Sequence, residues 1–170
     1  MAGNRYVVMG AGEVGYHLAR SLSQQKHDVS VIEIDPQKRE RIEDELDVLA
    51  VEGNGAHPSV LEAAGVSQCN LFMAVSSGDE ANLAAAHVAK HLGAASTVVR
   101  VGLAEEAITH RRLYEEVFGV DLLLSTQLLT TTRVLNRIRG AFVYRYQYFA
   151  VAEKELAVTA AAGRRHDRSH

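Results

Sequence analysis

Short runs of β-branched and other apolar residues alternate along the chain with segments whose apolar positions recur every three or four residues. The short runs predict buried strands, and the longer spacing predicts amphipathic helices. The expected strands are Arg5–Met9, Asp28–Ile34, Val48–Val51, Asn70–Val75, Thr97–Val101 and Asp121–Leu124. The expected helices are Ala11–Gln24, a charged helix starting at Pro36, His57–Ala64, Asp79–Leu92, Ala104–Phe118 and Gln127–Arg139.

Strict alternation of strands and helices is typical of βαβ units and therefore of a parallel sheet. Right-handed crossovers then give a doubly wound α/β fold of the Rossmann type. We expect six parallel strands with helices on both faces. A nucleotide would lie across the switch point beyond the carboxyl end of the first strand.

Residues 140–170 follow a different pattern. The segment FVYRYQYFAV alternates apolar and polar positions, but it has no obvious strand to pair with in this domain. From about Gly163 the chain is short of large apolar residues, as in disordered tails. We expect a nucleotide-binding domain over residues 1–139, and over 140–170 a linker strand and a disordered tail.

The first strand ends in glycines at positions 10, 12 and 15, the GxGxxG spacing of a dinucleotide-binding turn. Gly10 permits the tight turn, Gly12 lets the backbone approach a pyrophosphate, and Gly15 lets the next helix pack closely on the sheet. That helix presents unpaired N–H groups and a partial positive charge to phosphates. The alternative is a turn of the same fold that binds no ligand.

A carboxylate follows at the expected place. Glu33 lies near the end of the second expected strand, 18 residues beyond Gly15, close to the roughly 20 residues typical of the ribose-binding acid. Glu33 would accept hydrogen bonds from the adenosine ribose hydroxyls and repel a 2′-phosphate, which favours NAD or another adenine nucleotide over NADP. Asp35 would either assist Glu33 or cap the helix that starts at Pro36.

Composition narrows the class of protein. The net charge of −3 and mixed charges give no general attraction to nucleic acid, whose backbone favours clustered Lys and Arg. No apolar run approaches the ~20 residues of a membrane helix, so we expect no direct membrane insertion. The single cysteine, Cys69, fits a reducing cytoplasm and is expected to be buried and inert.

Catalytic motifs are absent from the sequence. It has no Tyr-x-x-x-Lys pair, no GK[ST] phosphate loop and no GxSxG elbow. A dehydrogenase also needs a substrate domain, for which about 30 residues after the sixth strand and its helix leave no room. His87 and His91 have the spacing of two zinc ligands, but Val88 replaces the metalloprotease glutamate. We therefore expect no enzyme and no metal site.

Four segments resemble one family. VVMGAGEVGYHLARSL, VSVIEIDP, GNGAHPSVLEAAGV and AVSSGDEANL are similar to the amino-terminal domain of TrkA and KtrA proteins, cytosolic regulatory subunits of bacterial potassium uptake systems. The wider group is the RCK or KTN domain, which binds NAD. The similarity covers about residues 4–140. Beyond it, the chain resembles the approach to the family's carboxy-terminal ligand-binding domain, and we expect that domain to be missing from these 170 residues.

The resemblance implies a set of nucleotide-binding positions: Gly10, Ala11, Gly12, Glu13, Val14, Gly15, Glu33, Asn54, Gly55, Ser76, Ser77 and Arg100. Residues 10–14 would form the phosphate loop, and Asn54 and Gly55 would lie beside the adenine. Ser76 and Ser77 would lie near the phosphates or second ribose, unless they serve turn chemistry alone. Arg100 would reach the distal phosphate or a neighbouring subunit, unless it forms a structural ion pair.

As a family member, the chain would be a nucleotide-sensing regulatory subunit that gates a membrane-embedded potassium transporter of the Trk or Ktr type. Its cofactor would be NAD/NADH or ATP/ADP, which share the adenosine half. It would form a homodimer or higher oligomer, in the cytoplasm and peripheral to the inner membrane through its partner. Two alternatives stay open: a small NAD-dependent oxidoreductase completed by another subunit, and a dimerisation module with a structural nucleotide.

Overall fold

The computed structural model describes residues 4–102 and 109–125. The chain divides into two units, Met1–Gln127 and Leu128–His170, and every described residue lies in the first. The expected domain boundary after residue 139, the helix Gln127–Arg139 and the segment 140–170 therefore lie outside the described residues. Within the described part, no helix is long and apolar enough to span a membrane.

Strands and helices alternate along the described chain, as the hydrophobic pattern predicts. The strands are β1 (Arg5–Met9), β2 (Asp28–Glu33), β3 (Leu49–Glu52), β4 (Leu71–Ala74), β5 (Thr97–Val101) and β6 (Leu122–Ser125). The helices are α1 (Glu13–Gln24), α2 (Pro36–Glu45), α3 (Pro58–Ala63), the short 3₁₀ helix η1 (Val66–Gln68), α4 (Asp79–His91) and α6 (Arg111–Phe118).

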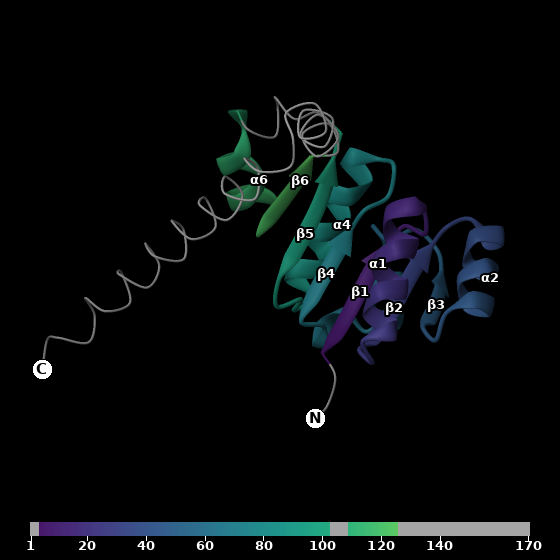
Figure 1. The fold of residues 1–170 in the computed structure, drawn as a ribbon. Coiled ribbons are helices and arrows are strands. Elements are labelled where there is room, and N and C mark those ends of the chain that lie inside the picture. Colours follow the sequence, from purple (N-terminus) through teal and green to yellow (C-terminus); the bar gives the residue numbers. More distant parts are fainter. Residues whose placement is uncertain (1–3, 103–108, 126–170) are drawn as a thin grey trace, which may run out of the picture. The chain divides into compact units, whose positions relative to one another are not determined.

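The six strands form one sheet in the order β3-β2-β1-β4-β5-β6, and every neighbouring pair is parallel. Figure 1 shows the strands side by side with the helices around them. The chain order runs outward in both directions from β1, so the switch point lies between β1 and β4. The expected Rossmann-type fold is confirmed, and this topology opens a crevice at the carboxyl ends of the central strands.

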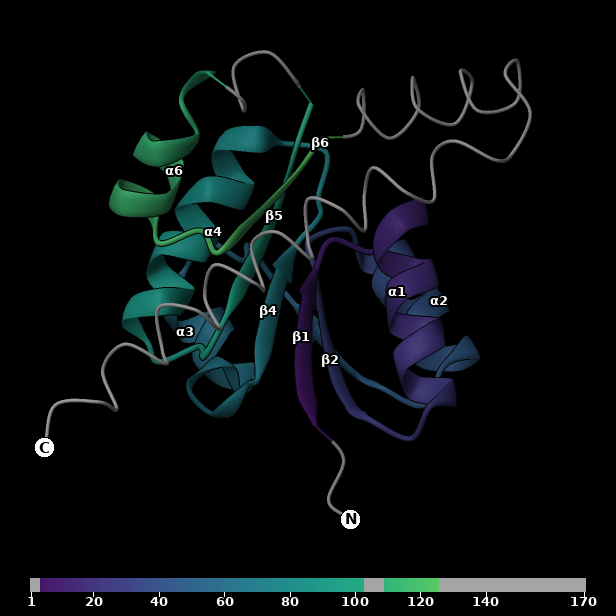
Figure 2. The same cartoon turned by 60° about the vertical axis from the view of Figure 1, so that its left-hand side comes forward.

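Successive residues of the central strands face opposite sides of the sheet and supply two cores. On one side Val7 and Phe72 pack with the buried alanines of α4, and on the other side Val8 and Met73 pack with Ile42 of α2. Figure 2 shows α3, α4 and α6 on one face and α1 and α2 on the other. The central strands β1, β2 and β4 are therefore buried on both faces, which explains their nearly continuous apolar sequences.

Most boundaries differ from expectation by one or two residues, and the shifts shape the site. The first helix begins at Glu13 with Gly12 as its N-cap, rather than at Ala11. The second strand ends at Glu33, not Ile34, so Ile34 belongs to the loop above the sheet. In the segment expected as helix Ala104–Phe118, the described part is helical over Arg111–Phe118, and residues 103–108 lie outside the description.

Phe72 tests the packing of the core. Its side chain is fully buried on β4, so Phe72→Ala removes its apolar contacts and leaves a cavity. We expect the free energy of unfolding to fall by about 3–5 kcal/mol in chemical denaturation. Leu113→Ala on α6, where the side chain is 50% exposed, is the control and should change stability by less than about 0.5 kcal/mol. Equal losses in the two variants would contradict this account of the core.

Candidate nucleotide-binding site

A cleft of about 780 Å³ lies at the carboxyl ends of β1 to β5. Most of the positions implied by the resemblance line it: Gly10, Gly12, Glu13, Val14, Glu33, Asn54, Gly55, Ser76, Ser77 and Arg100. These residues come from five separate loops or strand ends, and the parallel sheet brings them together because its strands all end at the same edge. Ala11 and Gly15 do not line this cleft.

The three glycines of the turn serve different purposes in the structure. Gly10 has a φ of +99°, and a Cβ there would come within 2.8 Å of the Ser76 backbone. A Cβ on Gly15 would lie 1.7 Å from the carbonyl oxygen of Gly10, so Gly15 allows α1 to approach the turn. A Cβ on Gly12 would meet nothing within 4 Å. The fold therefore requires Gly10 and Gly15, whereas the space above Gly12 is open.

Glu33 fastens the glycine turn to the end of β2. Its side chain is 7% exposed. One carboxylate oxygen accepts a hydrogen bond from the N–H of Ala11 at 2.5 Å, and the other accepts from Ile34 and Asp35 at 2.8 and 2.9 Å. A carboxylate has about four acceptor positions. Three are taken by the backbone, so Glu33 keeps room for about one hydrogen bond from a ligand.

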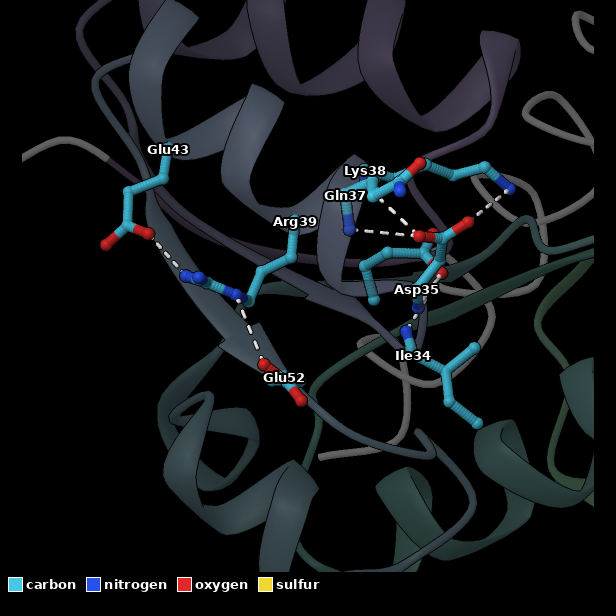
Figure 3. Close-up of polar contacts among 8 residues, drawn as sticks. Ile34, Asp35, Gln37, Lys38, Arg39, Glu43 and Glu52 are labelled. Carbon is cyan, nitrogen blue, oxygen red and sulfur yellow. Dashed lines mark hydrogen bonds and ion pairs between the residues drawn. The ribbon is translucent and has the colours of Figure 1, made fainter.

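Asp35 caps the helix that follows. It is the N-cap of α2, and its Oδ1 accepts hydrogen bonds from the N–H groups of Gln37 and Lys38 at 3.0 and 3.4 Å (Figure 3). The Lys38 ammonium lies 3.7 Å from its other oxygen. Asp35 and Lys38 also line the cleft. Capping thus fixes the direction in which α2 leaves the cleft, and Lys38 brings a positive charge to its rim.

Asn82 holds the opposite wall, and the sequence patterns did not single it out. Its side chain is fully buried on α4. Its Oδ1 accepts hydrogen bonds from the Ser76 N–H at 3.0 Å and the Ser76 hydroxyl at 2.6 Å. Its amide donates to the carbonyl oxygens of Ser76 and Arg100, each at 3.0 Å. Asn82 therefore joins the loop after β4 to the end of β5.

Arg100 faces the same cleft from β5. Its Nη1 donates to the Ser76 carbonyl oxygen at 3.0 Å, and its buried Nε has no hydrogen-bond partner among the described residues. No described ion pair involves Arg100, so the structure gives no support to the expected alternative of a structural salt bridge. The guanidinium retains donors for a ligand. Ser76 lines the cleft, and its hydroxyl also makes the turn contact with Asn82.

Two exposed apolar side chains also line the cleft. Ile34 is 66% exposed and Val14 is 40% exposed. Exposed large aliphatic side chains within a cleft are suited to contact the flat face of a base. The hydrophobic pattern placed Ile34 inside the second strand, so the sequence did not predict that Ile34 lines the cleft. Asn54, on the loop after β3, accepts a hydrogen bond from the Ala56 N–H at 2.9 Å, which shapes the loop beside the cleft.

Groups outside the cleft show other chemistry. The rings of His87 and His91 lie 4.4 Å apart between centroids, but the described residues contain no group of three or more His, Cys, Asp or Glu arranged to hold a metal ion. Burial raises the pKa of the Cys69 thiol to about 11, which keeps it protonated and unreactive at neutral pH.

The described lining of the cleft itself contains no His, Cys or Tyr. Its groups are suited to hold anions and hydroxyls.

Residues 6–126 match the model of the TrkA-N domain. The chain belongs to the TrkA-N domain family. The resemblance seen in the sequence is thereby confirmed. A "Trk system potassium uptake protein TrkA homolog" from Archaeoglobus fulgidus is 45% identical over 124 residues, which are 73% of this chain and 28% of the relative. A TrkA protein from Azorhizobium caulinodans is 31% identical over 137 residues, 79% of this chain and 30% of the relative. The chain thus spans under a third of either relative's length.

Solved structures share the fold of this TrkA-N domain. The TrkA-N domain of the inner membrane protein ybaL from Escherichia coli superposes with a TM-score of 0.67 at 19% identity, over 79% of this chain and 96% of that one. The GsuK channel bound to NAD superposes with a TM-score of 0.60 at 15% identity, over 72% of this chain and 21% of that one. The AMP-bound Kef CTD from Shewanella denitrificans superposes with a TM-score of 0.64 at 20% identity, over 94% of this chain and 93% of that one.

The substitution Asn82→Ala tests whether the hydrogen bonds of Asn82 stabilise the wall of this TrkA-N cleft. Asn82→Ala removes the acceptor and donors that satisfy Ser76 and Arg100, leaving partly buried backbone groups without partners. Because each such group costs about 1–3 kcal/mol, we expect the free energy of unfolding to fall by at least about 2 kcal/mol in denaturant titration. Ser77→Ala, at an exposed neighbour in the same loop, should change it by less than about 0.5 kcal/mol. A loss that small in Asn82→Ala would refute the supporting role.

Proposed function

We propose that this TrkA-N domain is the nucleotide-sensing part of a potassium uptake system of the Trk or Ktr type. The cleft would bind NAD(H) or ATP/ADP, and the bound nucleotide would control a membrane potassium transporter. The proposal is supported by the family, by the potassium uptake proteins named among its relatives and by the groups that the cleft presents.

The open space above Gly12 is the observation that carries the binding proposal. The fold leaves no room for a side chain at Gly15 and leaves Gly12 unobstructed, with a φ of −66° that any residue can adopt. Structural constraints thus account for Gly15 and do not account for Gly12. Close approach of a ligand's phosphates to the first turn of α1 does account for it, because N–H groups there have no partner within the helix.

The other groups of the cleft orient the ligand in this proposal. Ile34 and Val14 pack against the adenine, and the remaining acceptor position of Glu33 takes a ribose hydroxyl. The pyrophosphate lies over Gly12. The next phosphate or the second ribose then reaches Ser76 and Arg100, whose Nε is buried and unpaired within the described part. Ligands that share the adenosine half differ at this end of the cleft.

Sensing follows from that difference. A ligand shifts a conformational equilibrium only by as much as its affinity differs between the two states. NAD and ATP make the same contacts at Glu33 and different contacts at Arg100. Arg100 is joined to Ser76, and both are joined to α4 through Asn82. The end of β5 and the start of α4 are therefore the parts of the fold that would register which ligand is bound.

The partner and the assembly belong to the same proposal. The transporter would be a membrane-embedded potassium subunit, with this domain in the cytoplasm and peripheral to the membrane, acting as a dimer or larger oligomer. We propose no catalytic role, because the described lining offers anion-binding groups. Oxidation of NADH by the purified chain with any carbonyl substrate, followed by absorbance, would contradict the regulatory assignment.

Gly12→Ala separates binding from folding. Its Cβ meets no protein atom within 4 Å, so the free energy of unfolding should change by less than about 1 kcal/mol. The methyl group would obstruct phosphates, so calorimetric titration should show at least about tenfold weaker binding of NAD and ADP. Gly15→Ala, the matched control, should destabilise the fold because its Cβ would lie 1.7 Å from the Gly10 oxygen.

Two titration results would defeat the proposal that the cleft binds a nucleotide. The first is the failure of the wild-type chain to bind any of NAD, NADH, ATP and ADP. The second is binding by Gly12→Ala as tight as by the wild type. Glu33→Ala is a poorer test, because it would also remove the acceptor of three backbone N–H groups and so weaken the loop itself.

A further inference from the structure

A second hollow, of about 490 Å³, opens between α1 and α2 beside the nucleotide cleft. Arg20 of α1 and Lys38 and Arg41 of α2 line it, and Ala11 and Gly12 form the wall shared with the glycine turn. We call it the basic hollow. Gly12 and Lys38 line the nucleotide cleft as well. The two spaces are therefore contiguous at the glycine turn.

The basic hollow carries more positive than negative groups. Glu13 is the carboxylate in its lining, against the three cations Arg20, Lys38 and Arg41. The ion pairs at its border are exposed: Lys38 lies 3.7 Å from Asp35, with side chains 54% and 41% exposed. Exposed pairs of this kind contribute little to stability, so a bound phosphate can compete for the cation.

Arg41 lines the hollow from α2, and Arg20 lines it from α1. The Arg41 guanidinium lies 4.7 Å from the centre of the Tyr16 ring and 3.0 Å from a Glu45 oxygen. Hydrogen bonds from Tyr16 and Arg41 lower the pKa of Glu45, and the positive charge of Arg20 adds to the effect. Arg20 forms no ion pair of its own among the described residues. Its charge is therefore available to a ligand.

Glu33 cannot accept hydrogen bonds from both ribose hydroxyls. Three of its roughly four acceptor positions receive backbone N–H groups, so it can hold about one ribose hydroxyl. The oxygen with the free position is the one that accepts from Ala11, and Ala11 borders the basic hollow. The second ribose oxygen would thus lie next to a space lined by cations.

We propose that the basic hollow binds a phosphate group carried on the adenosine ribose. This TrkA-N domain would then accept ribose-phosphorylated adenine nucleotides, of which NADP is one, beside the unphosphorylated ones. The inference rests on the proposed function, because it needs adenosine in the cleft. It reverses the expectation drawn from Glu33 alone, because Arg20, Lys38 and Arg41 supply positive charge to a phosphate in the hollow.

The test compares 5′-AMP with adenosine 2′,5′-bisphosphate and adenosine 3′,5′-bisphosphate by calorimetric titration of the full chain. We expect one bisphosphate to bind about tenfold more tightly than 5′-AMP at low salt, and the better isomer identifies the ribose oxygen that faces the hollow. Arg20→Gln and Arg41→Gln, whose side chains do not line the nucleotide cleft, should abolish this advantage and leave 5′-AMP binding unchanged.

Arg112→Gln on α6, where the side chain is 91% exposed, removes the same charge elsewhere and should keep the advantage. If 5′-AMP binds and both bisphosphates bind more weakly, the inference is wrong and the proposed function stands. The inference is equally wrong if Arg20→Gln and Arg112→Gln have equal effects on bisphosphate binding. If neither 5′-AMP nor a bisphosphate binds, the inference fails, and the titrations with NAD, NADH, ATP and ADP decide the proposed function separately. Thermal unfolding of each variant verifies that it is folded.

Discussion

The carboxylate of Glu33 holds the site together. Beside the switch point of the sheet, the turn after β1 and the turn after β2 both have backbone N–H groups that need acceptors. One buried side chain accepts from both turns, through Ala11 on one side and Ile34 and Asp35 on the other. Because an unpaired buried N–H is costly, this arrangement fixes the glycine turn before any ligand arrives.

The opposite wall uses a neutral amide for the same purpose. Asn82 satisfies the loop after β4 and the end of β5 together, and a Cβ on Gly10 would collide with that loop at Ser76. The two walls are thus each internally bonded and meet at the glycine turn. A nucleotide would bridge them, in contact with Glu33 at one end and Arg100 at the other. A bridging ligand of this kind couples its own chemistry to the geometry of the cleft.

The sequence pattern predicts the fold and the glycine turn with Glu33, whereas the positions of Asn54, Ser76 and Arg100 beside the cleft were implied by the family resemblance. Apolar runs specify the strands, and the GxGxxG spacing with Glu33 specifies the turn. Asn82 escaped prediction because an asparagine inside an alanine-rich helix shows no sign of being buried. Ile34 escaped because its β-branched side chain extends the pattern of β2 by one residue. The basic hollow depends on two helices packing side by side, and the charges of α2 alone indicate an ordinary solvated helix.

The central claim is that one cleft receives adenine nucleotides that differ beyond the adenosine half. The most direct measurement is a competition titration, in which NADH is bound to the full chain at saturation and ATP is then added in a calorimeter. The account predicts that ATP and NADH compete for one site per chain. Bound NADH should therefore lower the apparent affinity for ATP by the factor expected for simple competition. Independent binding of both ligands to the same chain, or binding of neither, would contradict it.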